Sequence, residues 1–401
     1  MKTFHRKYLF VVTILFLNKV AAAFGNENPP RNLIELEDWS CIDGVWQSSS
    51  LNIDKPKPCT ITFGEAGLKE TCINFDDERR CWWTFVPSTI MEDEKVPLVI
   101  DMHGGGLTAD AQMATSGYLE LAESQKFILV YPKGRNNLWS TCGSDEMSCD
   151  QFSSKIGDVW DDIGFLTQLI SNVVQVTDAD QPWSNLIDPE RVYTTGFSMG
   201  CMMAQRYALE RSKVLAGFAC HGGELNYIGE ESTQTLDDYK NSYDLQPMPA
   251  FLTIGTDDKS YLPLAEQDFI NWSYWNTCPD ADAKSEITTT LTLIGSGKED
   301  TESVDVNRTS SGPCTIDDLS IDTVIMKLMG VGHAPDSRVA GPSYEFLKSR
   351  TRPGALDELP SPVETISLII SSSAASAKVF SAIVGILNAG VVVCSTLLLA
   401  A

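Results

Sequence analysis

Histidine and basic side chains are both scarce in this sequence. Only four of the 401 residues are histidine, so a reaction that needs an imidazole base has few candidates for it. Lys and Arg number 30 against 54 Asp and Glu, which gives a formal net charge of −24. A surface so negative repels the phosphates of DNA and RNA, and this excludes nucleic acid as a partner.

Long apolar runs are confined to the two ends of the chain. The run Tyr8–Leu17 is too short to span a bilayer. With basic residues before it and Ala21–Ala23 behind it, the run is typical of a secretory signal peptide, with a buried N-terminal helix as the alternative. We therefore exclude residues 1–23 from the fold and expect a secreted protein.

The second run, Val379–Ala401, is long enough to span a membrane. No Lys or Arg follows it, although a retained transmembrane helix usually has basic residues on its cytoplasmic side. Because the small residues Ser371–Ala375 precede it, the run resembles a glycolipid (GPI) anchor signal whose tail is removed. We expect membrane contact only through this anchor, with a single transmembrane helix as the alternative.

The eleven cysteines of an exported chain indicate disulfides rather than metal ligands. Cys394 lies in the apolar tail, which leaves an even number. The expected pairs are Cys142–Cys149, Cys278–Cys314 and Cys201–Cys220, with Cys41, Cys59, Cys72 and Cys81 pairing among themselves. Two glycosylation sequons, at Asn271 and Asn307, also suit export.

Residues 24–75 have little periodicity and predict an irregular, cysteine-containing extension. From residue 76 to 350, strand-like and helix-like patterns alternate; 280–320 reads as a polar insertion and 351–378 as a linker. Apolar runs predict strands at Trp82–Val86, Leu98–Met102, Phe127–Tyr131, Val192–Phe197, Leu215–Ala219, Phe251–Ile254 and Val324–Met329. Helices are expected at Tyr118–Ala122, Met202–Leu209, Leu264–Trp275 and from Asp161 or Asp162 to Val174. This alternation predicts an α/β fold, with a mostly parallel central sheet covered by helices on both faces.

A G-x-S-x-G motif occupies Gly196–Gly200, between a predicted strand and a predicted helix. A sharp strand-to-helix turn needs small residues around its serine, and the turn lifts that serine above the sheet. The context predicts an α/β-hydrolase fold with Ser198 as the nucleophile. A Gly/Ser turn without catalytic function is the alternative.

Chain order selects the base, because in this fold the nucleophile, the acid and the histidine follow one another. His5 leaves with the signal peptide, and His103 precedes Ser198. His221 follows the serine too closely to leave room for an acid. His333, in a loop after the last predicted strand, therefore remains.

The acid is expected after a strand between Ser198 and His333. The strand Phe251–Ile254 leads to two adjacent candidates, Asp257 and Asp258. A carboxylate at this place would fix the imidazole tautomer and stabilise the imidazolium. The residues alone leave the choice between the two open.

Donors for a developing oxyanion are expected from the glycine run that follows the strand Leu98–Met102. Glycines let backbone N–H groups approach an oxygen without interference from a side chain. We expect the amide of Gly105 or Gly106 to act together with that of Met199, and His103 to order the loop. A phosphate-binding loop is the rival interpretation, but it lacks the Lys-Ser/Thr ending. No metal or cofactor is implied.

Six segments carry a family resemblance. They are Pro97–Asp110, Phe127–Pro132, Asp161–Phe165, Ser198–Ala204, Gly255–Asp258 and Gly332-His333. In order and spacing they resemble the extracellular polyhydroxybutyrate depolymerase and feruloyl esterase family, which is similar to carbohydrate esterase family 1. The resemblance spans about Cys81–Lys348, and the family's acid motif has its aspartate in fourth place, which implies Asp258.

This resemblance implies a serine carboxylesterase that works through an acyl-enzyme, on feruloyl or acetyl esters of polysaccharides or on a polyhydroxyalkanoate polyester. Trp139 and Trp160 lie near the nucleophile in similar proteins and could stack on a phenolic acyl group or a sugar, or belong to the core. The chain departs from the family at Ile254, where a histidine is common, and at Ala334-Pro335, where an aromatic residue is common. A serine peptidase of the same fold and a non-catalytic surface binding module are the alternatives.

Overall fold

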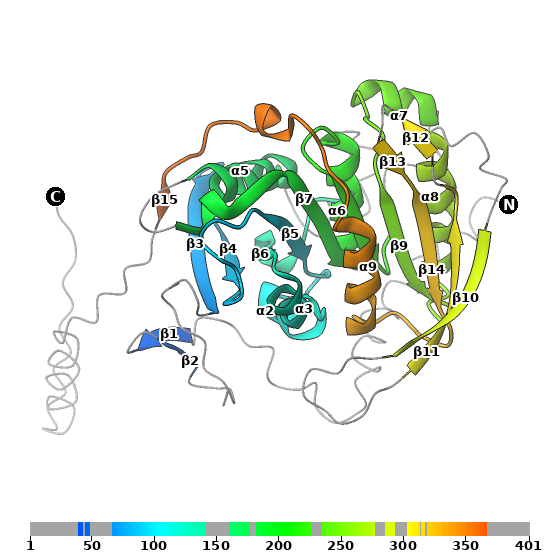
Figure 1. Cartoon of the computed structure of the whole chain (residues 1–401), viewed down its shortest axis with the longest axis horizontal. Coiled ribbons are helices and arrows are strands. Elements are labelled where there is room, and N and C mark those ends of the chain that lie inside the picture. The colour runs from blue at the N-terminus through cyan, green and yellow to red at the C-terminus, as the bar shows by residue number, and fades with distance from the viewer. Residues whose placement is uncertain are drawn as a thin grey trace, which may run out of the picture. The chain divides into compact units, whose positions relative to one another are not determined.

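The computed structural model describes residues 39–42, 45–48, 66–141, 160–176, 182–225, 235–276, 285–292, 303–312, 314–316 and 319–366. Its centre is an eleven-stranded sheet in the order β10-β11-β14-β9-β8-β7-β5-β6-β4-β3-β15 (Figure 1). Two further sheets have two short strands each and are not hydrogen-bonded to the large one: β1 (Trp39–Ile42) with β2 (Val45–Ser48), and β12 (Cys314–Ile316) with β13 (Leu319–Ile321).

The middle of the large sheet is parallel, and nearly all of its residues are buried. It consists of β6 (Ile128–Pro132), β5 (Val96–Met102), β7 (Ile187–Phe197), β8 (Gly217–His221), β9 (Ala250–Gly255) and β14 (Thr323–Leu328). Parallel strands covered on both faces read as continuous apolar runs, which is why the sequence located each of them. Antiparallel strands extend the sheet at both edges: β4 (Glu78–Val86), β3 (Gly67–Phe75) and β15 (Thr365–Ile366) on one side, β11 (Ser303–Ser310) and β10 (Ser285–Thr292) on the other.

Helices cover both faces of the sheet (Figure 1). One apolar layer joins the sheet to α5 (Asp162–Gln175), α6 (Met199–Glu210), α7 (Leu236–Ser242) and α8 (Leu262–Trp275). The other joins it to α2 (Ala109–Thr115), α3 (Tyr118–Gln125) and α9 (Ala340–Leu347). Along β5, Leu98 and Ile100 pack into the first layer and Val99 into the second, as the two-residue period of a strand requires. The expected α/β-hydrolase architecture is therefore present, with short 3₁₀ turns at Arg135–Asn137, Pro182–Leu186, Ser337–Val339 and Ala355–Glu358.

Three segments without a clear pattern in the sequence contribute to this body. The end of the expected irregular extension forms β3, and the expected insertion 280–320 supplies β10 and β11. In the expected linker, the guanidinium Nε of Arg352 donates to the Leu215 carbonyl at 2.9 Å, and β15 pairs with β3. Edge strands have one polar side, so they lack the continuous apolar run that marks the central strands.

The expected disulfide Cys201–Cys220 is present, and within the group of four cysteines whose pairing was left open Cys72 is joined to Cys81. Cys72–Cys81 joins β3 to β4, and Cys201–Cys220 joins the first turn of α6 to β8. Each of the other expected pairs includes a cysteine that lies outside the described residues or whose side chain is not described. Asn271 corrects one glycosylation prediction: it lies on α8 with 3% of its surface exposed, so the folded protein has no room for a glycan there.

No helix in the described ranges is long and apolar enough to cross a membrane. The predicted signal peptide, 1–23, and the predicted anchor segment, 379–401, lie outside those ranges.

Candidate active site

Ser198 occupies the sharp turn between β7 and α6 at the carboxyl end of the sheet. Its φ of 53° and ψ of −117° are unusual for a residue with a side chain. Both flanking glycines are required: a Cβ on Gly200 would lie 2.0 Å from the Met102 carbonyl oxygen, and one on Gly196 would lie 2.6 Å from the carbonyl carbon of Gly200. The Ser198 amide donates to the His221 carbonyl at 2.8 Å, which fixes the turn to β8.

His333 lies between Ser198 and Asp258. Its Nε2 is 3.0 Å from the Ser198 Oγ, and its Nδ1 is 2.6 Å from the Asp258 Oδ2. Asp258 is 4% exposed, whereas Asp257 is open to solvent and pairs with Lys259 at 3.1 Å. The structure thus brings the three residues of the expected triad together, with Asp258 rather than its neighbour against the imidazole.

The glycine loop after β5 lies beside the start of α6. A Cβ on Gly105 would lie 3.3 Å from the Met199 Sδ, so the loop backbone closely approaches that residue. The Gly106 amide donates to the Asn137 carbonyl at 2.8 Å. The Gly106 N–H therefore already has an acceptor in this structure, which favours Gly105 of the two expected loop donors. No backbone carbonyl in the described ranges accepts from Gly105, and this leaves the amides of Gly105 and Met199 as the candidate pair.

His103 is buried beneath this loop and holds it. The Gly134 amide donates to its Nε2 at 3.0 Å, so the proton lies on Nδ1, which donates to the Gly104 carbonyl at 2.9 Å. Burial lowers the pKa of His103 to about 4, which keeps the ring neutral. Its contacts are those of a residue that orders the loop.

Both tryptophans expected near the substrate are enclosed by protein instead. Trp139 is 1% exposed, and its indole N–H donates to the His103 carbonyl at 2.9 Å. Trp160 is 8% exposed, its N–H donates to the Asp162 carboxylate at 2.7 Å, and the Arg135 guanidinium lies over its ring. Neither presents an open face for stacking in this structure, and the contacts of both favour the alternative that they belong to the core.

His221 is a residue whose contribution the sequence did not reveal. Its Nε2 lies 3.1 Å from the Ala334 carbonyl and must donate to it, since a carbonyl oxygen only accepts. The side chain of His221 thereby holds the residue after His333, while its backbone carbonyl holds Ser198. The only indication of this role in the sequence was the position of His221, two residues after the predicted strand Leu215–Ala219.

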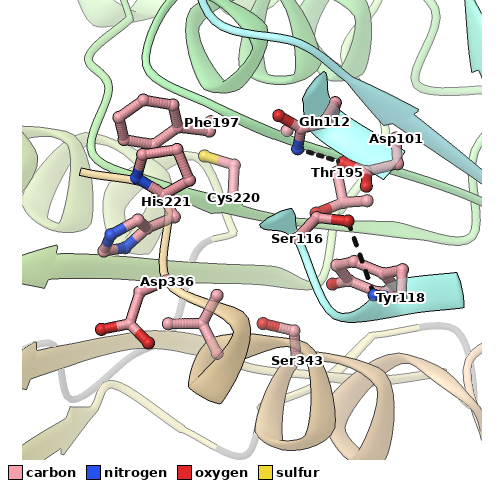
Figure 2. Close-up of a pocket in the computed structure, with 13 residues that line it drawn as sticks. Asp101, Gln112, Ser116, Tyr118, Thr195, Phe197, Cys220, His221, Asp336 and Ser343 are labelled. Carbon is pink, nitrogen blue, oxygen red and sulfur yellow. Dashed lines mark hydrogen bonds between the residues drawn. The ribbon is translucent and has the colours of Figure 1, made fainter. Parts of the chain in front are cut away.

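A small cavity lies beside β7, bordered by Phe197, His221 and Asp336 near the triad and by Asp101 and Tyr118 on its far side (Figure 2). The buried Asp101 accepts from the Gln112 side-chain amide at 2.7 Å, and its second oxygen has no hydrogen-bond partner among the described residues. Burial raises the pKa of Asp101 to about 7. The one grouping of potential metal ligands within the described ranges, Glu70 with Cys72 and Cys81, has both of its sulfurs in a disulfide.

Comparison with known proteins gives three relevant matches. A bifunctional acetylxylan esterase/xylanase of Neocallimastix patriciarum is 25% identical over 274 residues, which cover 67% of this chain and 33% of that protein. Poly(3-hydroxyalkanoate) depolymerase C of Paucimonas lemoignei is 32% identical over 126 residues, 31% of this chain and 27% of that enzyme. An acetyl xylan esterase structure from Aspergillus awamori aligns with 70% of this chain and 98% of its own, with 16% identity and a TM-score of 0.46.

This chain spans about a third or less of the length of these two sequence relatives. Residues 89–278 match the model of a family described as phospholipase/carboxylesterase. The two sequence relatives and the family match confirm the resemblance that the motifs indicated. The chain has the α/β-hydrolase fold, and over residues 89–278 it is related to the phospholipase/carboxylesterase family.

Proposed function

We propose that this protein is a serine carboxylesterase. The observation that carries the proposal is the continuous hydrogen-bonded series from Asp258 through His333 to Ser198, set on a strained turn at the carboxyl end of the sheet. A serine hydroxyl becomes a nucleophile when an adjacent base accepts its proton, and a carboxylate behind the imidazole stabilises the imidazolium that forms.

Ser198 Oγ attacks the ester carbonyl carbon while His333 Nε2 takes the hydroxyl proton. The amides of Gly105 and Met199 donate to the oxyanion of the tetrahedral intermediate. His333 then gives the proton to the departing alcohol, which leaves an acyl group on Ser198. In the second half, His333 deprotonates a water molecule that attacks the acyl-enzyme, and the carboxylic acid leaves.

The relatives favour two substrate classes. One relative is an acetylxylan esterase/xylanase, and the other is a depolymerase of a hydroxyalkanoate polyester. We accordingly propose ester bonds of a polymer as the substrate, either acetyl or feruloyl groups on a polysaccharide or the links of a polyester.

We further propose that the enzyme acts outside the cell. The predicted signal peptide and the disulfides Cys72–Cys81 and Cys201–Cys220 support export, because disulfides persist in oxidising compartments. Anchoring through 379–401 stays a prediction. Release of the protein from intact cells by phosphatidylinositol-specific phospholipase C tests it, and recovery of the 379–401 peptide from mature protein would contradict it.

The test of function is a substrate panel of aryl acetate, acetyl-xylan, methyl ferulate and hydroxybutyrate oligomers, with a peptide as control. Ser198→Ala should lower ester hydrolysis at least about a thousandfold and leave thermal stability nearly unchanged. Ser124→Ala, at an exposed serine of α3, is the matched control and should leave the rate unchanged. A serine-directed phosphonate should label Ser198 alone. Peptide cleavage without ester cleavage would instead support a peptidase.

A further inference from the structure

The imidazole of His333 lies between two aromatic rings. The Tyr261 ring is stacked on it, with centroids 4.8 Å apart and an interplanar angle of 23°. The Phe197 ring also packs against it, at 4.9 Å and 39°. Phe197 immediately precedes the nucleophile and Tyr261 follows Asp258 by three residues, so the two segments that carry the candidate triad also enclose its base.

Tyr261 contacts the acid as well as the base. Its backbone amide donates to the Asp258 Oδ1 at 3.3 Å, while the other carboxylate oxygen faces His333. The next amide, from Leu262, donates to the Asp258 backbone carbonyl at 2.9 Å. The start of α8 therefore sets the direction of the carboxylate, and the Tyr261 ring covers the imidazole that the carboxylate orients.

An aromatic ring in this position has two physical effects. The terminal torsion of a histidine is broad, so a hydrogen bond at Nδ1 alone leaves the ring some freedom to rotate. Stacking removes part of that freedom and keeps Nε2 directed at Ser198. The negative face of the tyrosine π system also attracts a cation, so it favours the imidazolium that exists only after Ser198 has lost its proton.

We propose that Tyr261 is a positioning residue of the esterase reaction, which holds the His333 ring in line with Ser198 and stabilises its protonated form. This inference rests on the proposed function. It gives Tyr261, the residue immediately before α8, a role in the reaction beyond packing against its neighbours.

The test compares two variants of Tyr261. Tyr261→Phe keeps the ring, whereas Tyr261→Leu keeps an apolar side chain over His333 but removes the π face. We expect kcat for an aryl ester to fall about 2- to 10-fold in Tyr261→Leu, with KM unchanged, and to stay within about 2-fold in Tyr261→Phe. Tyr274→Leu is the matched control: Tyr274 lies on α8, the helix that Tyr261 precedes, with 47% of its surface exposed, and its loss should change neither constant.

The pH dependence separates positioning from general packing. Because Leu still covers His333, loss of the π face should move the acidic limb of the kcat/KM profile to lower pH, by about 0.5 to 1 pH unit. The same shift should appear in the NMR titration of the His333 Cε1 proton, a signal easily assigned in a chain with four histidines.

The outcomes distinguish this inference from the proposed function. If no ester of the panel is hydrolysed, the function fails, yet the NMR titration still tests the Tyr261 contact. An unchanged kcat and an unchanged titration in Tyr261→Leu would overturn the inference. A rise in KM alone would assign Tyr261 to substrate binding instead, and an equal loss in Tyr261→Phe would assign the effect to the hydroxyl.

Discussion

The buried carboxyl of Asp101 should make the protein less stable as the pH rises through neutrality. Asp101 lies near the end of β5 with no exposed surface, and its carboxylate accepts from the neutral side-chain amide of Gln112. Burial without a compensating cation disfavours the charged form, and it raises the pKa of Asp101 to about 7 from its ordinary 3.8.

The sign of the pH effect follows from proton binding. Between about pH 4 and pH 7 the folded state holds a proton on Asp101 that the unfolded state has released, so the free energy of unfolding falls as pH rises through this window. This rise in the pKa of Asp101 corresponds to a loss of at most about 4 kcal/mol in the free energy of unfolding, and the loss is complete above pH 7. Burial raises the pKa values of Asp110, Glu224 and Asp268 to about 7 as well, so Asp101 accounts for only part of the total loss of stability between about pH 4 and pH 7.

The substitution Asp101→Asn isolates that share, because asparagine has nearly the same shape and does not titrate. Urea unfolding from pH 4.5 to pH 8 should show a shallower loss of stability in Asp101→Asn than in the wild type, with the two curves diverging by about 2 to 4 kcal/mol across the range. Asp93→Asn, at an exposed turn before β5, should run parallel to the wild type. Parallel curves for Asp101→Asn would refute the reasoning.

Three further tests concern the triad acid, the disulfide beside the nucleophile and the buried Trp139. Asp258→Asn should lower kcat by about 10² to 10⁴ and Asp257→Asn by less than about 3-fold; the reverse order would move the acid by one residue. Replacing both Cys201 and Cys220 with alanine should lower the free energy of unfolding by about 3 kcal/mol in urea titrations, since the bond closes a loop of 19 residues, and an unchanged midpoint would contradict this. Trp139→Phe should cost about 1 to 3 kcal/mol of stability, because the His103 carbonyl loses its donor, and should leave KM unchanged; a raised KM would restore the stacking role.

The fold was predictable where burial leaves an unambiguous mark. Each central strand is covered on both faces and therefore appears as an apolar run. Of the two residues expected to begin α5, Asp161 and Asp162, the first caps the helix, and its carboxylate accepts from the Gly164 amide at 2.7 Å. Of the antiparallel strands, β4 was predicted from its apolar run Trp82–Val86, whereas β3, β10 and β11 were missed because polar residues interrupt them. In β11 only Val304 and Val306 are fully buried, an alternation too brief to stand out within a polar segment.

Within the site, chain order identified more than composition did. The G-x-S-x-G turn and the shortage of histidines selected Ser198 and His333, and the family resemblance selected Asp258 over Asp257; the structure places these three residues in contact. Chain order could not decide whether Gly106 is an oxyanion donor or whether Trp139 contacts the substrate. Whether an amide already has an acceptor, or an indole ring is already enclosed, depends on residues such as Asn137 and His103 that lie far away in the chain or carry no motif.

Strand β8 gives both halves of the candidate triad a common support. Its last residue, His221, accepts from the Ser198 amide through its carbonyl and donates to the Ala334 carbonyl through its ring. The residue before it, Cys220, is joined covalently to the helix that follows the nucleophile. Because the hydrogen bond between Ser198 and His333 spans 135 residues of sequence, its length depends on how firmly two separate loops are fixed to one rigid element. The buried parallel strand β8 is that rigid element. The burial that holds the triad geometry in place is therefore the same burial that allowed the strand to be predicted from its apolar run.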